Sequence, residues 1–329
     1  MMDELISKFP AQLTEALEIG QRAQLNHHTN SINKVFVAGM GGSGIGADFV
    51  ASFVRDECKV PYLVGKSYDI PSYVDENTLA IASSYSGNTE ETLVAFEQML
   101  KSGAKVVVIS GGGQLIEKAK SLGLDFIQVP GDWPSPRACL GYSLVQQLYV
   151  LYHLDLISNK AIKSVENSVR LLENASDDIK SSAEKAAQTL YHKMPIIYTT
   201  DRMEPVAIRF RQQVNENSKM LCWHHVIPEM NHNELVGWRD VDEKLAVIYF
   251  RSEDDYYRNK VRIEINKEII DNYTHTIIEF FAQGSDLVEQ SLYLVHLGDW
   301  ISFYLAELRG MDAVEVKVID HLKSELKKH

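Results

Sequence analysis

The sequence predicts two consecutive α/β domains, each built on a doubly wound parallel sheet. Three observations favour this fold class. Short apolar runs recur along the chain, segments with helical periodicity lie between them, and the pattern appears in both halves. Strands of a parallel sheet are buried on both faces, so they are expected as continuous apolar runs rather than alternating ones.

The first half contains five predicted strands. A helical segment over 3–28 comes before them, with apolar residues at four-residue spacing. The strands are expected at 34–39, 62–65, 78–83, 105–110 and 125–129. Helices are expected at 90–102 and 114–122, and a long helix over 136–156 closes this half. Alternating strands and helices of this kind predict a sheet in the order 2-1-3-4-5.

The second half repeats the pattern at similar size. Residues 158–192 are predicted to be helical with one polar face. Strands are expected at 195–200, 245–250 and 276–281. Helices are expected at 205–216, 256–272, 286–308 and 314–328. We therefore expect one domain over residues 1–156 and a second over 157–329.

Composition excludes several classes of protein. The chain has 329 residues, with 33 basic and 45 acidic side chains and a net charge of -12, which disfavours nucleic acid as a partner. Cys58, Cys139 and Cys222 lie far apart, which suits a reducing cytosol and offers neither disulfides nor a zinc knot. No apolar run approaches the ~18 residues that span a membrane. We expect a cytoplasmic protein without membrane or nucleic-acid partners.

A glycine-rich loop follows the first predicted strand. Residues 39–46 read Gly-Met-Gly-Gly-Ser-Gly-Ile-Gly, directly before a predicted helix. Glycine lets backbone N–H groups approach an anion, and the helix N-terminus adds partial positive charge. The same letters satisfy GxGxxG, but a dinucleotide site expects an acid at the end of the second strand, where Lys66 stands and Asp69 comes only later. The loop alone leaves a phosphate and a dinucleotide both open.

A serine-rich loop follows the third predicted strand. Residues 83–92 read Ser-Ser-Tyr-Ser-Gly-Asn-Thr-Glu-Glu-Thr. Hydroxyls at a strand-to-helix turn can donate to several phosphate oxygens, whereas an ordinary helix cap needs only one of them. Strands one and three are neighbours at the switch point of a 2-1-3-4-5 sheet. The two loops are therefore expected to face each other and to share one anion site.

Three segments together resemble a known family. Residues 84–92, with the glycine loop upstream, resemble the sugar isomerase (SIS) domain. Residues 215–219 (Asn-Glu-Asn-Ser-Lys) and 228–234 (Pro-Glu-Met-Asn-His-Asn-Glu) resemble signatures of the bifunctional phosphoglucose/phosphomannose isomerases. The likeness runs from the glycine loop to the C-terminal helix. Its departures are mild, with Ser218 in place of an expected alanine and Met230 in place of a leucine.

The resemblance implies an aldose–ketose isomerase and roles for individual residues. It implies that the substrate phosphate is bound by Gly42, Ser43, Ser84, Ser86 and Thr89. It also implies that Glu216 moves the proton, that His232 opens the sugar ring, and that Arg137 and Lys323 lie near the reacting end. A homodimer is implied, with the histidine supplied by the neighbouring chain. No metal or nucleotide cofactor is implied, and the metabolic setting would be glycolysis and gluconeogenesis.

Glu216 has a physical argument of its own. It comes at the end of the predicted helix 205–216, whose apolar stripe is Val206, Phe210 and Val214. A carboxylate there faces the negative end of the helix dipole, which disfavours its charged form and suits a general base near neutrality. Without the resemblance, a solvated surface glutamate is the more ordinary interpretation.

His232 lies in a polar segment that is expected to be a loop. A metal site is the alternative, made of His224, His225 and His232 with Glu229 or Glu234. The spacings match no standard zinc pattern such as HExxH, so we favour catalysis and predict no metal site.

Two cations complete the candidate site. Arg137 opens the predicted helix 136–156, where a cation opposes the helix dipole unless an anion lies beside it. A simple ion pair explains this placement equally well. Lys323 lies on the last predicted helix, and only the resemblance gives it a role.

Two other functions remain open at this point. One is a sugar-phosphate-sensing protein that binds without reacting, although the roughly 30 residues before the first strand are too few for a helix-turn-helix domain. The other is a nicotinamide-dependent oxidoreductase, which Lys66 and the serine loop disfavour. We predict interconversion of glucose 6-phosphate and mannose 6-phosphate with fructose 6-phosphate through an enediolate, without deciding the preferred aldose.

Overall fold

The structure is a computed structural model, which describes residues 1–26 and 31–328. The last residues of the predicted helix 3–28 lie outside this part. The chain forms two compact units. The N-terminal unit comprises Lys8–Glu173 with Asp286–Glu289, and the C-terminal unit comprises Met1–Ser7, Asn174–Ser285 and Gln290–His329. The predicted boundary at 156/157 lies before α7 (Lys160–Asn174), which falls in the N-terminal unit apart from its last residue.

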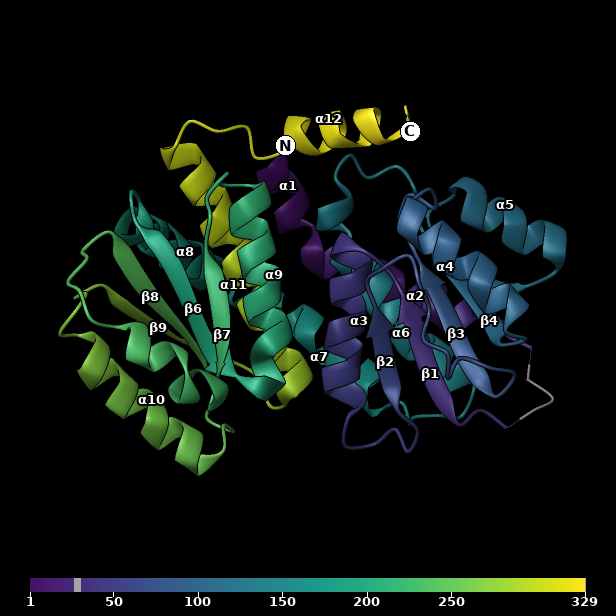
Figure 1. The fold of residues 1–329 in the computed structure, drawn as a ribbon, viewed down its shortest axis with the longest axis horizontal. Helices are drawn as coiled ribbons and strands as arrows, with labels where there is room; N and C mark the ends of the chain where they lie inside the picture. Colours follow the sequence, from purple (N-terminus) through teal and green to yellow (C-terminus); the bar gives the residue numbers. More distant parts are fainter. Residues whose placement is uncertain (27–30, 329) are drawn as a thin grey trace. The chain divides into compact units, whose positions relative to one another are not determined.

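The N-terminal unit is built on a five-stranded parallel sheet in the order β2-β1-β3-β4-β5 (Figure 1). Its strands are β1 (Lys34–Ala38), β2 (Tyr62–Gly65), β3 (Thr78–Ser83), β4 (Lys105–Ser110) and β5 (Asp125–Gln128). Its helices besides α7 are α2 (Phe9–Arg22), α3 (Gly41–Val54), α4 (Glu90–Lys101), α5 (Gly113–Leu122) and α6 (Leu140–His153). The predicted strand order is confirmed.

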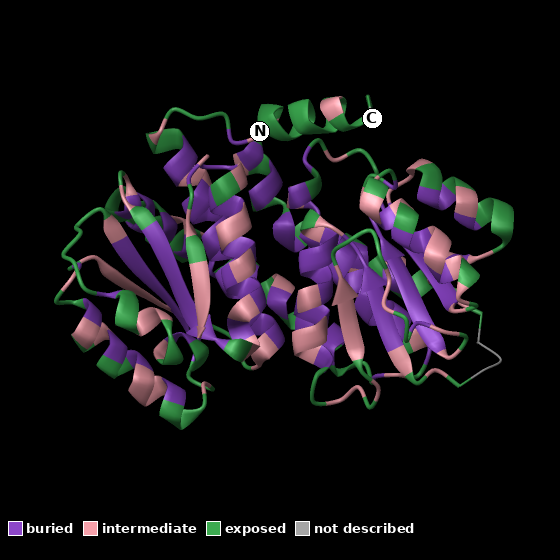
Figure 2. Ribbon diagram, viewed as in Figure 1, coloured by how far each residue is buried: buried purple, intermediate pink, exposed green. Residues whose placement is uncertain are grey.

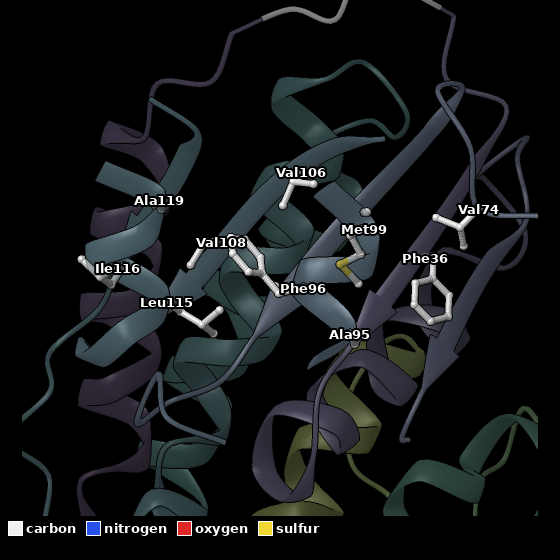
Figure 3. Close-up of a cluster of buried hydrophobic side chains, with 13 residues drawn as sticks. Phe36, Val74, Ala95, Phe96, Met99, Val106, Val108, Leu115, Ile116 and Ala119 are labelled. Atoms are coloured by element: carbon white, nitrogen blue, oxygen red, sulfur yellow. The ribbon is translucent and has the colours of Figure 1, made fainter. Parts of the chain in front are cut away.

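Burial explains why these strands read as apolar runs. Every residue of β3 and β4 is buried, because helices cover both faces of the sheet (Figure 2). On one face, Phe96 and Met99 of α4 and Leu115 of α5 pack against Val106 and Val108 of β4 (Figure 3). Helices α2, α3 and α6 form the other layer.

The predicted long helix 136–156 is wrong at its beginning. A 3-10 turn, η1 (Pro136–Ala138), comes first, and α6 begins only at Leu140. The break lies at Cys139, whose φ of -102° and ψ of 25° are not helical. Arg137 therefore belongs to a separate turn and is buried.

The C-terminal unit is built on a four-stranded parallel sheet in the order β7-β6-β8-β9. Its strands are β6 (Met194–Thr200), β7 (Trp223–Ile227), β8 (Leu245–Arg251) and β9 (Ile277–Phe281). Its helices are α1 (Met2–Ser7), α8 (Ser176–Leu190), α9 (Glu204–Glu216), α10 (Tyr257–Ile270), most of α11 (Leu287–Leu308) and α12 (Lys317–Leu326). The first strand of each sheet lies between the second and the third, so both sheets have a switch point.

Strand β7 was not predicted from the sequence. It is an edge strand with a half-exposed burial pattern (Figure 2), and it carries two adjacent histidines instead of an apolar run. On one face of this sheet, Ile263 and Ile270 of α10 pack with Tyr198 and Tyr249. Because β7 lies at the edge of the sheet, it lacks the continuous apolar run that identified the other strands.

No helix in the described part of the chain is both long enough and apolar enough to cross a membrane.

Candidate functional site

The glycine loop leads directly into α3. Met40 has extended backbone, α3 begins at Gly41, and no side chain caps this helix end. A Cβ atom at Gly44 would lie 2.6 Å from the carbonyl oxygen of Gly39, so the tight turn requires glycine. Lys66, which stands where a dinucleotide site would need an acid, forms an ion pair with Asp48 of α3. The loop therefore ends at a helix N-terminus without a side-chain cap, which is a favourable place for an anion.

Arg137 lies beside this loop. A Cβ atom at Gly42 would be 3.4 Å from the carbonyl oxygen of Pro136 and 3.8 Å from the Cα of Arg137. The turn that carries Arg137 therefore packs on the first residues of α3. The structure brings the backbone of the buried Arg137 beside the predicted anion site, and Arg137 also has interactions within the protein.

The serine loop has a fixed backbone and clustered hydroxyls. The hydroxyls of Ser84 and Thr89 are 2.8 Å apart, and Ser86 Oγ accepts a hydrogen bond from the Asn88 N–H at 3.2 Å. Gly87 has a φ of +65°, and a Cβ atom there would lie 1.8 Å from the carbonyl oxygen of Gly112. Glycine is therefore required at the turn.

The hydroxyl of Thr89 does not cap the helix that it precedes. Thr89 is the N-cap residue of α4, yet its side chain makes no capping hydrogen bond and pairs with Ser84 instead. The first-turn N–H groups of α4 thus lack a side-chain partner at this end, as do those of α3.

The two loops lie side by side, as the strand order predicted. Ala38 of β1 pairs with Ala82 of β3, and a Cβ atom at Gly39 would be 3.0 Å from the carbonyl oxygen of Ser83. Gly42, Ser43, Ser84, Ser86, Thr89 and Arg137 all belong to these loops or to the adjacent turn in the N-terminal unit. This arrangement can bind a dianion through hydroxyls and helix N-termini.

Polar side chains of α6 support both loops from behind, and our sequence analysis missed them. Ser143 Oγ donates to the carbonyl oxygen of Ser43 at 3.3 Å and lies 3.3 Å from Ser83 Oγ. Gln147 donates to Ser143 Oγ at 3.0 Å and accepts from the Tyr62 hydroxyl at 2.6 Å. The available signal was a serine and two glutamines within a largely apolar helix that is buried from Leu140 to Leu151.

Glu216 is the last residue of α9, as predicted, and a rigid loop follows it. Asn217 Nδ2 donates to Ser302 Oγ at 2.9 Å, and Ser218 Oγ donates to the carbonyl oxygen of Ser302 at 2.7 Å. Lys219, with a φ of 55°, donates to the Glu216 carbonyl oxygen at 2.5 Å. The hydroxyl of Ser218, which departs from the family pattern, thus adds a bond to α11 that alanine lacks.

His232 is exposed at the end of η3 (Glu229–His232). Its neighbour Met230, the second departure from the family pattern, is fully buried and accepts a contact from Asn231 Nδ2. Met230 thus fills the apolar position expected of leucine.

Two histidines of the alternative metal site each lie beside one carboxylate, and only Glu234 of these two carboxylates belongs to the predicted set. His224 Nε2 lies 3.5 Å from Glu204, whose pKa is lowered by its hydrogen bond to His224, and His225 Nδ1 lies 2.8 Å from Glu234. Within residues 1–26 and 31–328, no three His, Cys, Asp or Glu side chains form a group that could hold a metal ion.

Lys323 is exposed on α12. Glu216, His232 and Lys323 therefore lie on three separate elements of the C-terminal unit, at the end of α9, in η3 and on α12.

The switch point of the second sheet has a different character. Asp255, after β8, accepts hydrogen bonds from Thr200 Oγ1 at 2.7 Å and from the Ser252 N–H at 3.0 Å. Gln290 donates to Asp254 at 2.6 Å and accepts from Ser252 Oγ at 2.7 Å. A carboxylate of the chain itself thus bonds to the donors at these strand ends.

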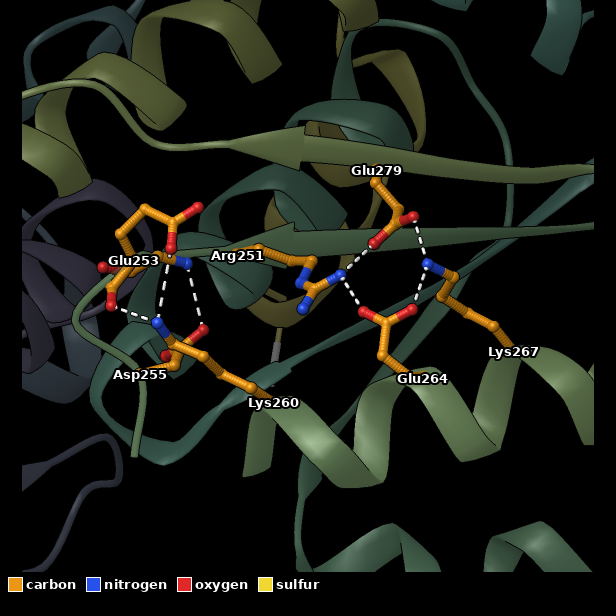
Figure 4. A network of polar contacts seen from close by, with 8 residues as sticks. Arg251, Glu253, Asp255, Lys260, Glu264, Lys267 and Glu279 are labelled. Carbon is orange, nitrogen blue, oxygen red and sulfur yellow. Dashed lines mark hydrogen bonds and ion pairs between the residues drawn. The ribbon is translucent and has the colours of Figure 1, made fainter. Parts of the chain in front are cut away.

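A network of four charged side chains lies at the end of β8, next to these residues (Figure 4). Arg251, the last residue of β8, bonds to both Glu264 and Glu279, and Lys267 lies 2.7 Å from Glu264 and 2.5 Å from Glu279. Each cation has two carboxylate partners and each carboxylate has two cations. The network balances its own charge.

Comparisons with known proteins agree with this architecture. A model of the SIS domain matches residues 30–152, and a model described as the bacterial phospho-glucose isomerase C-terminal SIS domain matches residues 179–326. The tagatose-6-phosphate ketose/aldose isomerase of Escherichia coli has a TM-score of 0.72 at 16% identity, with 96% of this chain and 95% of that chain covered. The C-terminal domain of glucosamine-fructose-6-phosphate aminotransferase from Francisella tularensis gives 0.74 at 13%, with 95% and 96% covered. These structures establish the fold.

Sequence relatives are more specific. A bifunctional phosphoglucose/phosphomannose isomerase from Caldicellulosiruptor bescii is 37% identical over 336 residues, covering 99% of this chain and 98% of the relative. One from Aquifex aeolicus is 37% identical over 298 residues, covering 90% and 91%. The chain therefore belongs to the bifunctional phosphoglucose/phosphomannose isomerase family and is an isomerase.

Proposed function

We propose that this protein interconverts glucose 6-phosphate and mannose 6-phosphate with fructose 6-phosphate. The observation that carries the proposal is the pair of adjacent loops, where two helix N-termini without side-chain caps lie beside clustered hydroxyls. Family membership supports the choice of substrate, because the relatives are named for glucose and mannose phosphates.

The phosphate is the anchor in this proposal. Ser43, Ser84, Ser86 and Thr89 donate through hydroxyls or backbone N–H groups, and the absence of a side chain at Gly42 leaves room for close approach. Hydroxyl and amide donors bind a dianion without holding its charge as tightly as several cations would, which favours release of the product. The hydroxyl pair of Ser84 and Thr89 supports this role.

Glu216 is the base in the proposed reaction. Its carboxylate removes the proton from C2 of the open-chain aldose, giving an enediolate, and returns the proton to C1. A hydroxyl proton passes from O2 to O1, so the carbonyl moves to C2. No electron leaves the substrate, and no external acceptor is needed. Glucose and mannose phosphates differ only at C2, so both give the same enediolate.

Three other residues complete the mechanism. His232 exchanges a proton with the ring oxygen to open the cyclic sugar. Arg137 and Lys323 stabilise the negative charge of the enediolate. The rigid loop after Glu216 supports the placement of the base, because Asn217 and Ser218 both bond to Ser302 of α11. We also propose a homodimer in which the partner supplies the histidine, and activity without metal or nucleotide.

A coupled assay with each aldose phosphate tests the proposal. We expect fructose 6-phosphate from both substrates, activity that survives prolonged EDTA treatment, and no thermal shift on addition of NAD. Binding of both phosphosugars without turnover would favour a sensing protein. Loss of activity on chelation, restored by zinc, would favour the histidine–glutamate site.

A further inference from the structure

Glu234 is the most heavily bonded side chain in the segment that carries His232. Its carboxylate accepts hydrogen bonds from the Tyr198 hydroxyl at 2.6 Å and from Trp223 Nε1 at 3.0 Å, and lies 2.8 Å from His225 Nδ1. Tyr198 belongs to β6, and the other two belong to β7. One half-buried carboxylate thus joins the loop to two strands of the sheet.

The bond with Tyr198 has a fixed polarity. Burial, together with the hydrogen bond to Glu234, raises the pKa of Tyr198 well above its ordinary value. The hydroxyl therefore keeps its proton and donates to Glu234, while it accepts from Trp238 Nε1 at 3.2 Å. Both aromatic rings are buried, so the attachment point of Glu234 is part of the core.

The rest of the loop is held in the same way on both sides of His232. Asn231 Nδ2 donates to Asn266 of α10 at 2.7 Å. Asn233 accepts from the Glu234 N–H at 2.6 Å and donates to Glu229 at 2.8 Å. Among the described residues, the His232 side chain makes no hydrogen bond within the protein, so its neighbours in the loop fix its position.

We infer that Glu234 is a positioning residue for His232, holding the loop so that the imidazole reaches the ring oxygen of a cyclic sugar phosphate. This inference rests on the proposed function. Glu234 itself does not touch the substrate in this account, because three donors already surround its two oxygens. A displacement of about 1 Å can cost roughly 100-fold in rate.

The test compares substrates that do and do not need ring opening. Fructose 6-phosphate is mostly a closed furanose, whereas 5-deoxyfructose 6-phosphate has no hydroxyl at C5 and stays open. We expect Glu234→Ala to lower kcat on fructose 6-phosphate by about 10- to 100-fold. Exchange of the C1 proton of the 5-deoxy compound with solvent deuterium, followed by NMR, should stay near the wild-type rate.

A conservative replacement of Glu234 and a double variant with His232 test whether both residues act on ring opening. Glu234→Gln keeps the acceptor for Tyr198 and Trp223, and a change of His225 tautomer accommodates the new amide. This variant should recover most of the activity. Glu234→Ala combined with His232→Ala should be no slower than His232→Ala alone, because both changes act on one step. Glu243→Gln, an exposed carboxylate 3.8 Å from His275, is the matched control and should leave kcat unchanged.

Several outcomes would overturn the inference. Equal losses on the cyclic and the open-chain compound, or additive losses in the double mutant, would place Glu234 outside ring opening. A lower melting temperature with unchanged kcat per folded molecule would make its role structural only. If Glu234→Ala does not fold, Tyr198→Phe decides, because it removes one donor to Glu234. An unchanged kcat on fructose 6-phosphate in that variant would count against positioning. Failure of the proposed function looks different: wild-type protein would not isomerise fructose 6-phosphate, or His232→Ala would keep full activity.

Discussion

The two sheets have the same strand order around the switch point, but the chemistry at their strand ends differs. After β1 and β3, glycine and hydroxyl residues meet two helix N-termini that no side chain caps. After β6 and β8, Asp255 of the chain itself already accepts from Thr200 and the Ser252 N–H. One edge offers donors to an external anion, and the other supplies its own carboxylate.

The comparison separates the contribution of the strand order from the contribution of the side chains at the strand ends. Strand order creates the same edge in both units, because the first strand lies between the second and third. Only the side chains decide whether that edge can bind a ligand. The C-terminal unit instead carries the proposed base at the end of α9, away from its own switch point in sequence. We therefore expect changes in the two units to affect different measurements.

The largest effect is expected at Glu216. Glu216→Gln keeps the shape of the side chain but removes the proton acceptor, so kcat should fall by about 10²–10⁴-fold and exchange of the C2 proton should stop. The phosphate loops are untouched, so KM should change little. Glu268→Gln, an exposed glutamate on α10, is the control. Exchange at the native rate in Glu216→Gln would move the base elsewhere, with Glu229 examined next.

Substitutions in the phosphate loops should raise KM, whereas the substitution of Glu216 lowers kcat. The double variant Ser86→Ala, Thr89→Val loses two donors to a dianion, worth about 1.5–3 kcal/mol each. KM should rise about tenfold or more per residue, with little change in the melting temperature. Ser121→Ala, whose exposed hydroxyl donates to the Lys118 carbonyl oxygen within α5, serves as the control. An unchanged KM in the double variant would remove this loop from the site.

A pH-dependent effect on stability is expected from His296 in the C-terminal unit. Burial, with a smaller contribution from Lys180, lowers the pKa of His296 to about 4, against an ordinary value of 6.5. Between these values the unfolded chain binds more protons than the folded protein, so acid favours unfolding. The free energy of unfolding should fall by about 3 kcal/mol from pH 6.5 to pH 4 through this group.

Denaturant titrations across this range test the pH effect. His296→Gln removes the titration and keeps an acceptor for Trp300 Nε1, which lies 3.3 Å from His296 Nε2. The slope of stability against pH should be shallower in this variant than in the wild type. Parallel slopes would show that His296 does not contribute.

The smallest effect is expected at Asp255. Asp255→Ala leaves the buried Thr200 hydroxyl and Ser252 N–H without their acceptor and should cost about 1–3 kcal/mol of stability. Asp255→Asn keeps one acceptor oxygen and should cost less. Neither variant should alter KM, since this edge bonds internally. A raised KM in both would show that the second sheet contributes to substrate binding, and the contrast between the two edges would fail.

The sequence was most informative where physical constraints repeat along the chain. Buried parallel strands must be apolar, so the fold class and the order of the first sheet followed from simple runs. Strand β7 was not predicted, because an edge strand is half exposed and its histidines break the apolar pattern. The separate 3-10 turn at Pro136–Ala138 was not predicted, because nothing in the local sequence distinguishes it from the first turn of a helix.

The site residues also differ in how far the sequence alone could identify them. The glycine and serine loops could be located from their spacing after adjacent strands. Glu216, His232 and Lys323 are single residues on separate elements. The family resemblance gave them their roles, and only Glu216 had a physical argument beside it. Ser143 and Gln147 carried a readable signal, since polar residues in a buried apolar helix need partners. Glu234 became visible only when its donors from two strands were known.

The Thr89 hydroxyl, which bonds to Ser84 and not to its own helix, has a consequence for local stability. Without a side-chain cap, the first turn of α4 has weaker protection against fraying. An anion held there would itself serve as the cap, so occupancy and the order of this turn would be coupled. Hydrogen exchange at the first-turn amides of α4 should then slow as inorganic phosphate is added, while exchange in α10 stays constant. The ligand would complete the secondary structure of its own binding site.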